Sequence, residues 1–471
     1  MKRLLVRFLA KTSSVMTAAL CSIFAVLVLA APVRAGQDAR FLRFEEVEET
    51  LALFRDTGAA GTAIADGAAW DQWIRARDAE VRGRIDQGVE DSISNFILFG
   101  TSFTKLPRLD GPESVLAPTG EDASAPTPAA RERVHALALA LASPSGAERI
   151  AFIRAFLRQK GITPGSTESY LSQNLLRLAS EQRAYQEKLK EAANTGDSSA
   201  ILLARGTLYQ QRGLSIDTSL LPNFALQDTL RVMLQKNAIK PGTMRRILII
   251  GPGLDFTDKR DGFDFYPRQT IQPFAMLEAV ARLGLAKADE IEVVTADLNP
   301  AVNAHVAALA RRARSGQHYI VQLPRQISAD WSEAAVAYWQ HFGDLIGAPV
   351  KPLPVPAALQ DVTMRAVAIR PAFAARFKGY DLNAVTQTLD IPDGQKFDLV
   401  IATNVLVYYD LFQQALAMTS IARMMNPGGI FLVNHALPSL HPKGLEYLGS
   451  RSVKYTPTGA YGDDVVVYRK R

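Results

Sequence analysis

The sequence predicts an α/β protein in which a mostly α-helical region precedes a doubly wound, mainly parallel sheet with an antiparallel hairpin at its end. Two observations support this. From Asp38 to about Lys240, apolar residues recur every three or four positions, the spacing of helices with one buried face. From Arg245 onward, short apolar runs alternate with amphipathic segments, the order that places helices on both faces of a parallel sheet.

The first 35 residues have the pattern of a secretory signal. Four basic residues precede an apolar run from Val15 to Ala31, and Val33-Arg34-Ala35 offers small residues for cleavage after Ala35. The run is slightly shorter than the roughly 20 residues of a comfortable membrane span. We therefore expect an exported protein, periplasmic or secreted. The alternative is a membrane anchor formed by this segment if it is not cleaved.

Charge and metal-ligand spacing exclude several classes of partner. The chain has 53 Lys and Arg against 47 Asp and Glu, but five of the basic residues and none of the acidic ones lie in residues 1–35. The rest is nearly neutral, so we expect no nucleic acid partner. The single cysteine, Cys21, lies in the apolar run, which leaves no disulfide in the mature chain. The histidines lack the spacing of metal ligands, and no metal is expected.

The chain divides into two predicted regions after the signal. Residues 36–240 form a mostly helical region, with an exposed proline-bearing connection at 111–128. Residues 241–471 form the sheet region, interrupted by an insertion at about 325–380. The role of the helical region stays open between covering the active site, recognising a substrate and mediating assembly. Its later helices are expected at about 129–142, 145–159, 167–193 and 198–213.

The sheet region begins with residues 247–250, a β-branched run that ends in Gly251-Pro252-Gly253, as a buried parallel strand entering a tight turn does. The next predicted strand ends at Asp297, and Asn299 then caps a helix that starts with Pro300. Further strands are expected at 318–323, 384–391, 397–403 and 430–434, with helices at about 270–283 and 411–425 and a closing hairpin that pairs 445–455 with 464–469.

Candidate ligand-binding residues stand at the carboxyl ends of the first two strands. Gly251 and Gly253 lack a Cβ, so their backbone N–H groups can approach a ligand closely. Asp297 ends the next strand, where a carboxylate can accept both hydroxyls of a ribose. Parallel strands bring these positions to one edge of the sheet. Together they predict a nucleotide site.

A longer motif follows, with Phe397-Asp398-Leu399-Val400 leading to Asn404, and Pro427-Gly428-Gly429 opening the next strand. On these residues the chain resembles the class I S-adenosylmethionine-dependent methyltransferases, which have a Rossmann-like fold. Within that class, residues 404–409 look most like the chemotaxis receptor glutamate methyltransferases. The resemblance covers about 225 residues, with a gap at the insertion.

The resemblance implies S-adenosylmethionine as cofactor and a small molecule or protein as methyl acceptor. Gly251 and Gly253 would approach its amino-acid part, and Asp297 would hold the ribose hydroxyls. Asp390 or its neighbours would face the adenine, and Asn404 would line the end where the methyl group is transferred. It implies no specific catalytic residue. On the substrate side the candidates are Tyr408 and Tyr409, for which packing is the alternative.

Three features depart from the family's pattern. Ile249-Ile250 replaces the acidic residue that often precedes the glycine loop, and Asp255 stands in place of the third glycine. Residues 254–269 separate the loop from its helix, either as a lid or as a long loop.

These departures, and an export signal on a protein that would use a cytosolic cofactor, favour a second hypothesis. In it, the chain is an exported, non-enzymatic binding or scaffold protein that keeps the methyltransferase fold. A nicotinamide-dependent oxidoreductase is disfavoured because Phe256 occupies the last position of Gly-x-Gly-x-x-Gly.

Overall fold

A computed structural model describes the chain from residue 39 to 471, except for 56–63, 118–124, 145–146, 196–208, 210–211, 258–262, 358, 360, 435–443 and 460. The predicted signal at 1–35 and most of the predicted helix at 198–213 lie outside the described residues. The chain from residue 38 onward is one compact unit. Within the described ranges, no helix combines the length and apolar character that crossing a membrane requires.

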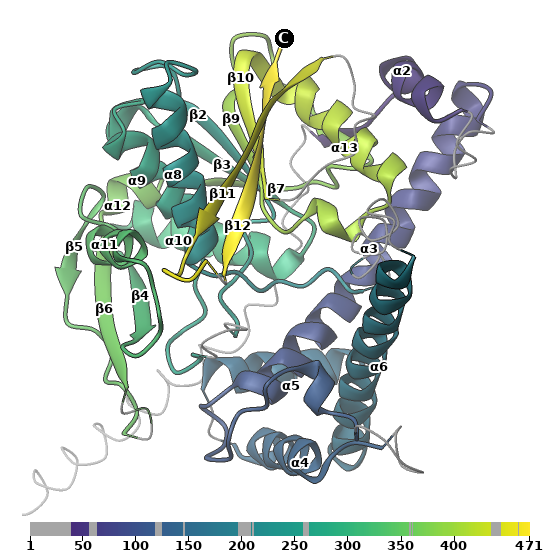
Figure 1. Ribbon diagram of the computed structural model, residues 1–471, viewed down its shortest axis with the longest axis vertical. Helices are drawn as coiled ribbons and strands as arrows, with labels where there is room; N and C mark the ends of the chain where they lie inside the picture. The colour runs from purple at the N-terminus through teal and green to yellow at the C-terminus, as the bar shows by residue number, and fades with distance from the viewer. Residues whose placement is uncertain are drawn as a thin grey trace, which may run out of the picture. The chain divides into compact units, whose positions relative to one another are not determined.

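The centre of the fold is a seven-stranded sheet with the order β11-β12-β10-β9-β2-β3-β7 (Figure 1). Five neighbouring strands are parallel, and the last two along the chain form an antiparallel hairpin on β10. From β2 the chain builds outward through β3 to β7, then returns to the other side of β2 to add β9 and β10. The strands are β2 (Arg246–Ile250), β3 (Glu292–Asp297), β7 (Lys378–Asp381), β9 (Phe397–Ala402), β10 (Met425–Val433), β11 (Leu445–Lys454) and β12 (Gly462–Lys470).

Both faces of this sheet are buried, because alternate residues of each central strand enter different cores. Ile247 and Ile249 pack into a core formed with α8 (Leu221–Gln235), α9 (Gln272–Arg282) and α10 (Pro300–Arg314). Leu248 and Ile250 pack on the opposite face, against α13 (Leu411–Met424), α2 (Phe44–Phe54) and the start of α3. The doubly wound arrangement that the sequence predicts is therefore confirmed.

The helical region is joined to the sheet by one long helix, α3 (Gly67–Phe99), which runs along the side of the molecule in Figure 1. Its first half packs on the sheet, and its second half forms a core with α4 (Pro128–Ala142), α5 (Glu148–Gln159) and α6 (Thr167–Asn194). At the N-terminal end of the described chain, β1 (Ala39–Phe41) pairs with β8 (Gln387–Leu389). The two predicted regions thus pack as one unit.

Two predicted strands of the main sheet are wrong. Residues 318–323 belong to β4 (Tyr319–Gln326), which pairs antiparallel with β6 (Val362–Ile369) in a separate sheet of order β4-β6-β5. Residues 384–391 contain only the short β8. The strand beside β3 is β7, inside the range predicted as insertion. The small sheet is completed by β5 (Gly347–Val350) and accompanied by α11 (Glu333–His341) and α12 (Pro371–Ala374).

The sequence explains both errors. In β4, Ile320 is 49% exposed between the buried Tyr319 and Val321, so the strand lacks the full burial of a central parallel strand. The real neighbour of β3 has only four residues, Lys-Gly-Tyr-Asp, without an apolar run. The position of β7 beside β3 is therefore set by tertiary packing and not by a pattern in its own sequence.

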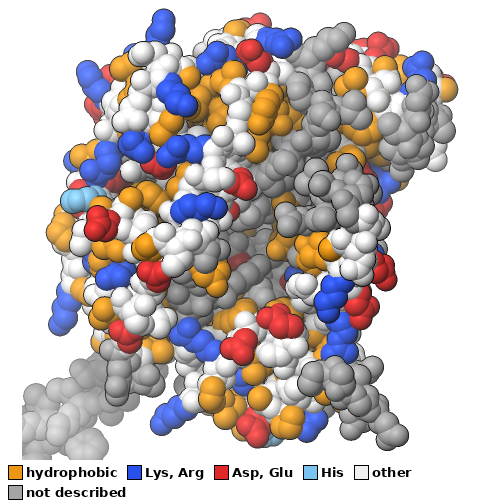
Figure 2. Space-filling model, viewed as in Figure 1, with side chains coloured by type: hydrophobic (Ala, Val, Ile, Leu, Met, Phe, Trp, Pro, Cys, Tyr) orange, Lys and Arg blue, Asp and Glu red, His pale blue; other side chains and the backbone are white. Residues whose placement is uncertain are grey.

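Basic and acidic side chains lie interspersed on the face of the molecule in Figure 2. This distribution agrees with the small net charge of the chain after its basic N-terminal segment.

Candidate active site

A cavity of about 460 Å³ lies at the carboxyl ends of β2, β3 and β9. Because the strand order reverses between β2 and β9, this is the topological switch point, where doubly wound sheets bind their ligands. The volume is in the usual range for small-molecule sites. The structure brings four of the five predicted cofactor residues into the lining: Gly251, Gly253, Asp297 and Asn404.

The two glycines of the loop are required by protein packing. Gly251 and Gly253 have φ of 67° and 65°, values that residues with a side chain rarely adopt. A Cβ on Gly251 would lie 2.4 Å from Cγ2 of Val405, and one on Gly253 would lie 2.8 Å from the carbonyl oxygen of Ile216. The glycines therefore allow other parts of the chain to approach the loop closely.

The N–H groups of the glycine loop are used within the protein, contrary to the sequence-based expectation. Gly251 N donates to the carbonyl of Ala296 at 2.8 Å, and the N–H of Gly253 donates to the carboxylate of Asp297. Leu254 N and Asp255 N donate to the carbonyls of Ile216 and Gln269, each at 2.7 Å. Pro252 has no N–H to offer. The loop presents a ligand with Cα atoms and carbonyl oxygens.

Asp297 is held at the end of β3 by backbone donors. Its carboxylate accepts from Asn299 N at 2.8 Å and from the N–H groups of Gly253 and Leu298. Burial raises the pKa of Asp297 to about 7, and these hydrogen bonds offset the rise only in part. The carboxylate therefore changes charge near neutral pH while it lines the cavity.

Asn404 follows β9 in a strained conformation. Its φ of 56° is in the left-handed region, which asparagine tolerates better than most residues. Its N–H donates to Oδ1 of Asn434 at 2.8 Å, and its Oδ1 accepts from Nδ2 of Asn434 at 2.7 Å. This reciprocal pair ties the ends of β9 and β10 together. It fixes Asn404 at the mouth of the switch point.

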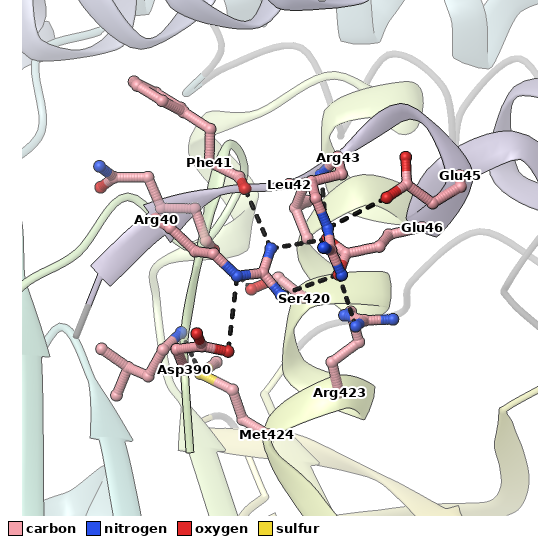
Figure 3. Close-up of polar contacts among 12 residues, drawn as sticks. Arg40, Phe41, Leu42, Arg43, Glu45, Glu46, Asp390, Ser420, Arg423 and Met424 are labelled. Atoms are coloured by element: carbon pink, nitrogen blue, oxygen red, sulfur yellow. Dashed lines mark hydrogen bonds and ion pairs between the residues drawn. The ribbon is translucent and has the colours of Figure 1, made fainter. Parts of the chain in front are cut away.

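Asp390, the fifth predicted cofactor residue, lies outside the cavity lining, and its prediction has to be corrected. Its side chain is 73% exposed, and its Oδ1 lies 3.5 Å from Nε of Arg40 (Figure 3). The prediction failed because residues 384–391, expected to be a strand of the sheet, contain only the short β8, which pairs with β1. After the true strand, β7, it is Leu382 and Ala384 that line the cavity.

The cluster around Asp390 has a structural role. Glu46 of α2 accepts hydrogen bonds from Arg40 and Arg43 and forms an ion pair with Arg423 of α13, so it joins two helices (Figure 3). Burial alone would raise the pKa of Glu46, but the hydrogen bonds from these arginines lower it to about 2.

Glu46→Gln should therefore destabilise the protein by about 2 kcal/mol at pH 7, a value reduced for solvent screening. A lowered pKa stabilises the fold above the unfolded value near 4, and this contribution is lost as pH falls toward 2. Urea unfolding at pH 7 and pH 3 measures this. Glu45→Gln removes a neighbouring carboxylate that is 63% exposed and should change the stability by less than about 0.5 kcal/mol. Equal effects of the two substitutions would contradict the assignment.

Part of the cavity wall comes from the helical region, for which covering the active site was one of three predicted roles. The sequence did not indicate which residues would form that wall. Nine consecutive residues, 214–222, line the cavity. Two glycines allow the start of this segment to pass close to α3. A Cβ on Gly88 of α3 would lie 2.0 Å from the carbonyl oxygen of Leu214, and one on Gly213 would lie 2.1 Å from N of Gly88. An isolated glycine inside a helical pattern usually has a packing reason. Gly88 was thus a usable signal.

The stretch 254–269, predicted as either a lid or a long loop, is fastened in its described part. Arg149 of α5 is buried and donates to the carbonyls of Asp255 and Asp264, at 2.9 and 2.8 Å, and to those of Phe256 and Tyr266. The carboxylate of Asp264 accepts hydrogen bonds from Thr101 and Ser102, just beyond α3. Its described residues therefore form a fixed wall of the cavity.

The predicted substrate-side tyrosines both line the cavity. Tyr408 lies in the 3₁₀ turn Leu406–Tyr408, and its ring meets that of Tyr209 edge-on at 5.6 Å. Nη1 of Arg84 donates to the carbonyl of Tyr408 at 3.0 Å, which ties this turn to α3. Burial raises the pKa of Tyr409 above its usual value. The phenol group of Tyr409 is therefore neutral at physiological pH.

No protein-family model and no curated protein sequence matches the chain. Solved structures do align with part of it. TrmN from Thermus thermophilus shares 17% identity, with 53% of this chain and 52% of that chain covered, at a TM-score of 0.26. The chain thus spans about half the length of TrmN. The N-methyltransferase NodS from Bradyrhizobium japonicum shares 12%, with 53% and 97% covered, at 0.26. Magnesium protoporphyrin IX methyltransferase from Synechocystis shares 9%, with 70% and 100% covered, at 0.25.

Because these TM-scores are low, we assign the fold from the chain's own strand order and C-terminal hairpin. The fold is a Rossmann-like, doubly wound sheet closed by an antiparallel hairpin, as the resemblance to the class I methyltransferases implies. The finer resemblance to the chemotaxis receptor glutamate methyltransferases remains a prediction. In the part of the chain that the structure describes, no group of His, Cys, Asp or Glu side chains could hold a metal ion.

Proposed function

We propose that the protein is an S-adenosylmethionine-dependent methyltransferase. The observation that supports this best is that one cavity at the switch point holds both glycines of the first loop, the carboxylate of Asp297 and the side chain of Asn404. These residues come from three neighbouring strands, and each lies where the strand meets the cavity.

The residues present fit this cofactor. Asp297 would accept the ribose hydroxyls, and Leu382 and Ala384 would lie on the adenine side. The carbonyl oxygens of the loop 251–253 suit the ammonium of its amino-acid part. When bound, S-adenosylmethionine supplies a methyl group on a positively charged sulfur. The chain would align an acceptor with that methyl group. Such alignment accounts for much of the rate in these reactions.

Two further segments wall the site. Residues 214–222 line it from the helical region, while Tyr266 lines it from the stretch that follows the glycine loop and Gln272 from the start of α9. The Thr403 hydroxyl accepts from Nε2 of the buried Gln272 at 2.8 Å, so the end of β9 is tied to the start of α9. A cavity whose walls are prearranged in this way strengthens the electrostatic interactions inside it.

One observation favours the alternative, a non-enzymatic binding or scaffold protein with the same fold. The glycine loop uses its N–H groups internally, so it cannot bind the carboxylate of the cofactor as an open loop would. The two hypotheses differ in whether S-adenosylmethionine binds at all.

Titration calorimetry with S-adenosylmethionine tests the proposal. We expect micromolar binding at pH 8 and a loss of about 100-fold in Asp297→Ala, because charge-assisted hydrogen bonds contribute roughly 1.5–3 kcal/mol each. Since the pKa of Asp297 is raised to about 7, its carboxylate is protonated below that pH. Affinity should fall by up to about tenfold from pH 8 to pH 6.

The pH dependence separates Asp297 from other titrating groups. Asp297→Ala should lack this part of the profile, while any titration of the ligand itself persists. Asp289→Ala, in the turn that leads into β3, should bind like the unchanged protein. No heat at millimolar ligand would reject the methyltransferase and leave the non-enzymatic hypothesis.

A further inference from the structure

The wall that would face the adenine is fastened to α3, a helix of the other region. Between β7 and β8 the chain forms no helix or strand, and this connection brings Leu382 and Ala384 into the cavity lining. Oδ1 of Asp78 on α3 accepts from Nδ2 of Asn383 and from the hydroxyl of Thr386, each at 2.8 Å. All three of these side chains are buried. One carboxylate of the helical region therefore holds the connection on both sides of Ala384.

Arg82, one turn further along α3, joins this carboxylate to both ends of the connection. Its Nε donates to Oδ2 of Asp78 at 2.8 Å, and its Nη1 donates to Oδ1 of Asp381, the last residue of β7, at 2.7 Å. Its Nη2 donates to Oε1 of Gln387, the first residue of β8, at 3.2 Å. Because a guanidinium presents its donors in a rigid planar fork, this one side chain fixes the two strand ends relative to each other.

Asp381 also lies beside the carboxylate that would hold the ribose. Asp381 and Asp297 are register partners at the ends of the parallel strands β7 and β3, and neighbouring strands lie about 4.8 Å apart. Burial is the main cause of the raised pKa of Asp297, and the charge of Asp381 adds to it. The charge of Asp381 therefore opposes the ionisation of Asp297 unless a cation offsets it.

The other groups around Asp297 are the same whether or not Asp381 is paired. The glycine loop and the start of α10 contribute backbone N–H groups. Tyr409, after β9, interacts electrostatically with Asp297 but is neutral, because burial raises its own pKa. Asp217 and Asp255 line the same cavity from other segments. A change confined to the Asp381 pair thus isolates the effect of that pair on Asp297.

We propose that Arg82 is a positioning residue for the cofactor, although it lies on α3 and outside the cavity lining. It holds the connection between β7 and β8 against the adenine, and it offsets the charge of Asp381 so that Asp297 can be ionised when it accepts the ribose hydroxyls. This inference rests on the proposed function. It gives the helical region a part in cofactor binding, in addition to its part in the cavity wall.

Calorimetry with S-adenosylmethionine at pH 6, 7, 8 and 9 tests this on the full-length protein. Arg82→Gln leaves the charge of Asp381 without its cation. Binding should weaken several-fold at every pH, and the pH midpoint of binding should rise by about 0.5–1 unit. Asp381→Asn should lower the midpoint by a similar amount. Combining the two substitutions should return the midpoint close to that of the unchanged protein.

Arg82→Lys separates the two roles of the side chain. Lysine keeps the charge but lacks the fork of donors, so the midpoint should stay near that of the unchanged protein while the affinity falls several-fold at every pH. Arg77→Gln is the matched control on the same helix, because Arg77 pairs with Glu80, whose side chain is 59% exposed. It should change neither the midpoint nor the affinity.

Failure of this inference differs from failure of the proposed function. If S-adenosylmethionine binds but the midpoint is the same in Arg82→Gln, Asp381→Asn and the unchanged protein, the inference is wrong and the methyltransferase remains. A profile that is flat across this pH range in every variant contradicts the inference equally. If the unchanged protein binds no S-adenosylmethionine, both proposals fall. Because the two expected shifts have opposite signs, either variant decides the question if the other does not fold.

Discussion

Gly88→Ala is expected to weaken binding of S-adenosylmethionine by at least tenfold, although residue 88 lies in a helix of the other region and outside the cavity lining. The added Cβ would lie 2.0 Å from the carbonyl oxygen of Leu214 and 2.3 Å from its carbonyl carbon. Backbone atoms cannot rotate away as a flexible side chain does, so the segment 214–222 must shift as a whole. That segment covers the cavity.

The cost to stability should be about 1–3 kcal/mol, as for other overpacked positions. Gly83→Ala is the matched control, since Gly83 lies in the same helix and a Cβ there meets nothing within 4 Å. It should stabilise the protein by up to about 1 kcal/mol through helix propensity. Calorimetry and thermal unfolding of both variants measure the effects. If Gly88→Ala binds the ligand as Gly83→Ala does, the segment does not cover the site.

The strand ends of the site could be predicted because they depend on local sequence. A β-branched run that ends in glycines, a strand that ends at Asp297 and the run into Asn404 each carry their own signal, and parallel pairing brings them to one edge. The prediction for Asp390 failed for the corresponding reason. It relied on 384–391 as a strand of the sheet, whereas the strand beside β3 is β7, which is too short and polar for its sequence to show it.

The walls of the site could not be predicted, because they arise from contacts between distant segments. Asp217 is held in the cavity wall by two contacts with distant segments. One is a hydrogen bond from Asn95, more than a hundred residues away, and the other is the β-bridge that pairs Asp217 with Leu254. Asp255 looked like a departure from a glycine pattern, whereas its carboxylate lines the cavity beside Tyr266. The chemistry of a motif says little about such positions; only packing places them.

Arg149→Met is expected to give the largest loss of stability, roughly 4–6 kcal/mol, and with it the loss of ligand binding. The guanidinium of Arg149 is buried and donates to four backbone carbonyls of the stretch 255–266. Methionine fills similar space but leaves these acceptors without their donor, and each unsatisfied buried group costs about 1–3 kcal/mol. The described residues of this stretch form no helix or strand, so the Arg149 side chain supplies hydrogen bonds that a helix or strand would otherwise provide.

Arg154→Met on the same helix separates this effect from a general loss of charge. Arg154 donates to the carbonyls of Leu141 and Ser143 at 2.9 and 2.6 Å, at the partly exposed end of α4. Water can replace those bonds, so we expect a loss of about 1 kcal/mol or less. Urea unfolding compares the two variants. Similar losses would mean that the stretch after the glycine loop holds its shape without Arg149, and a mobile lid would again be the better description of that wall.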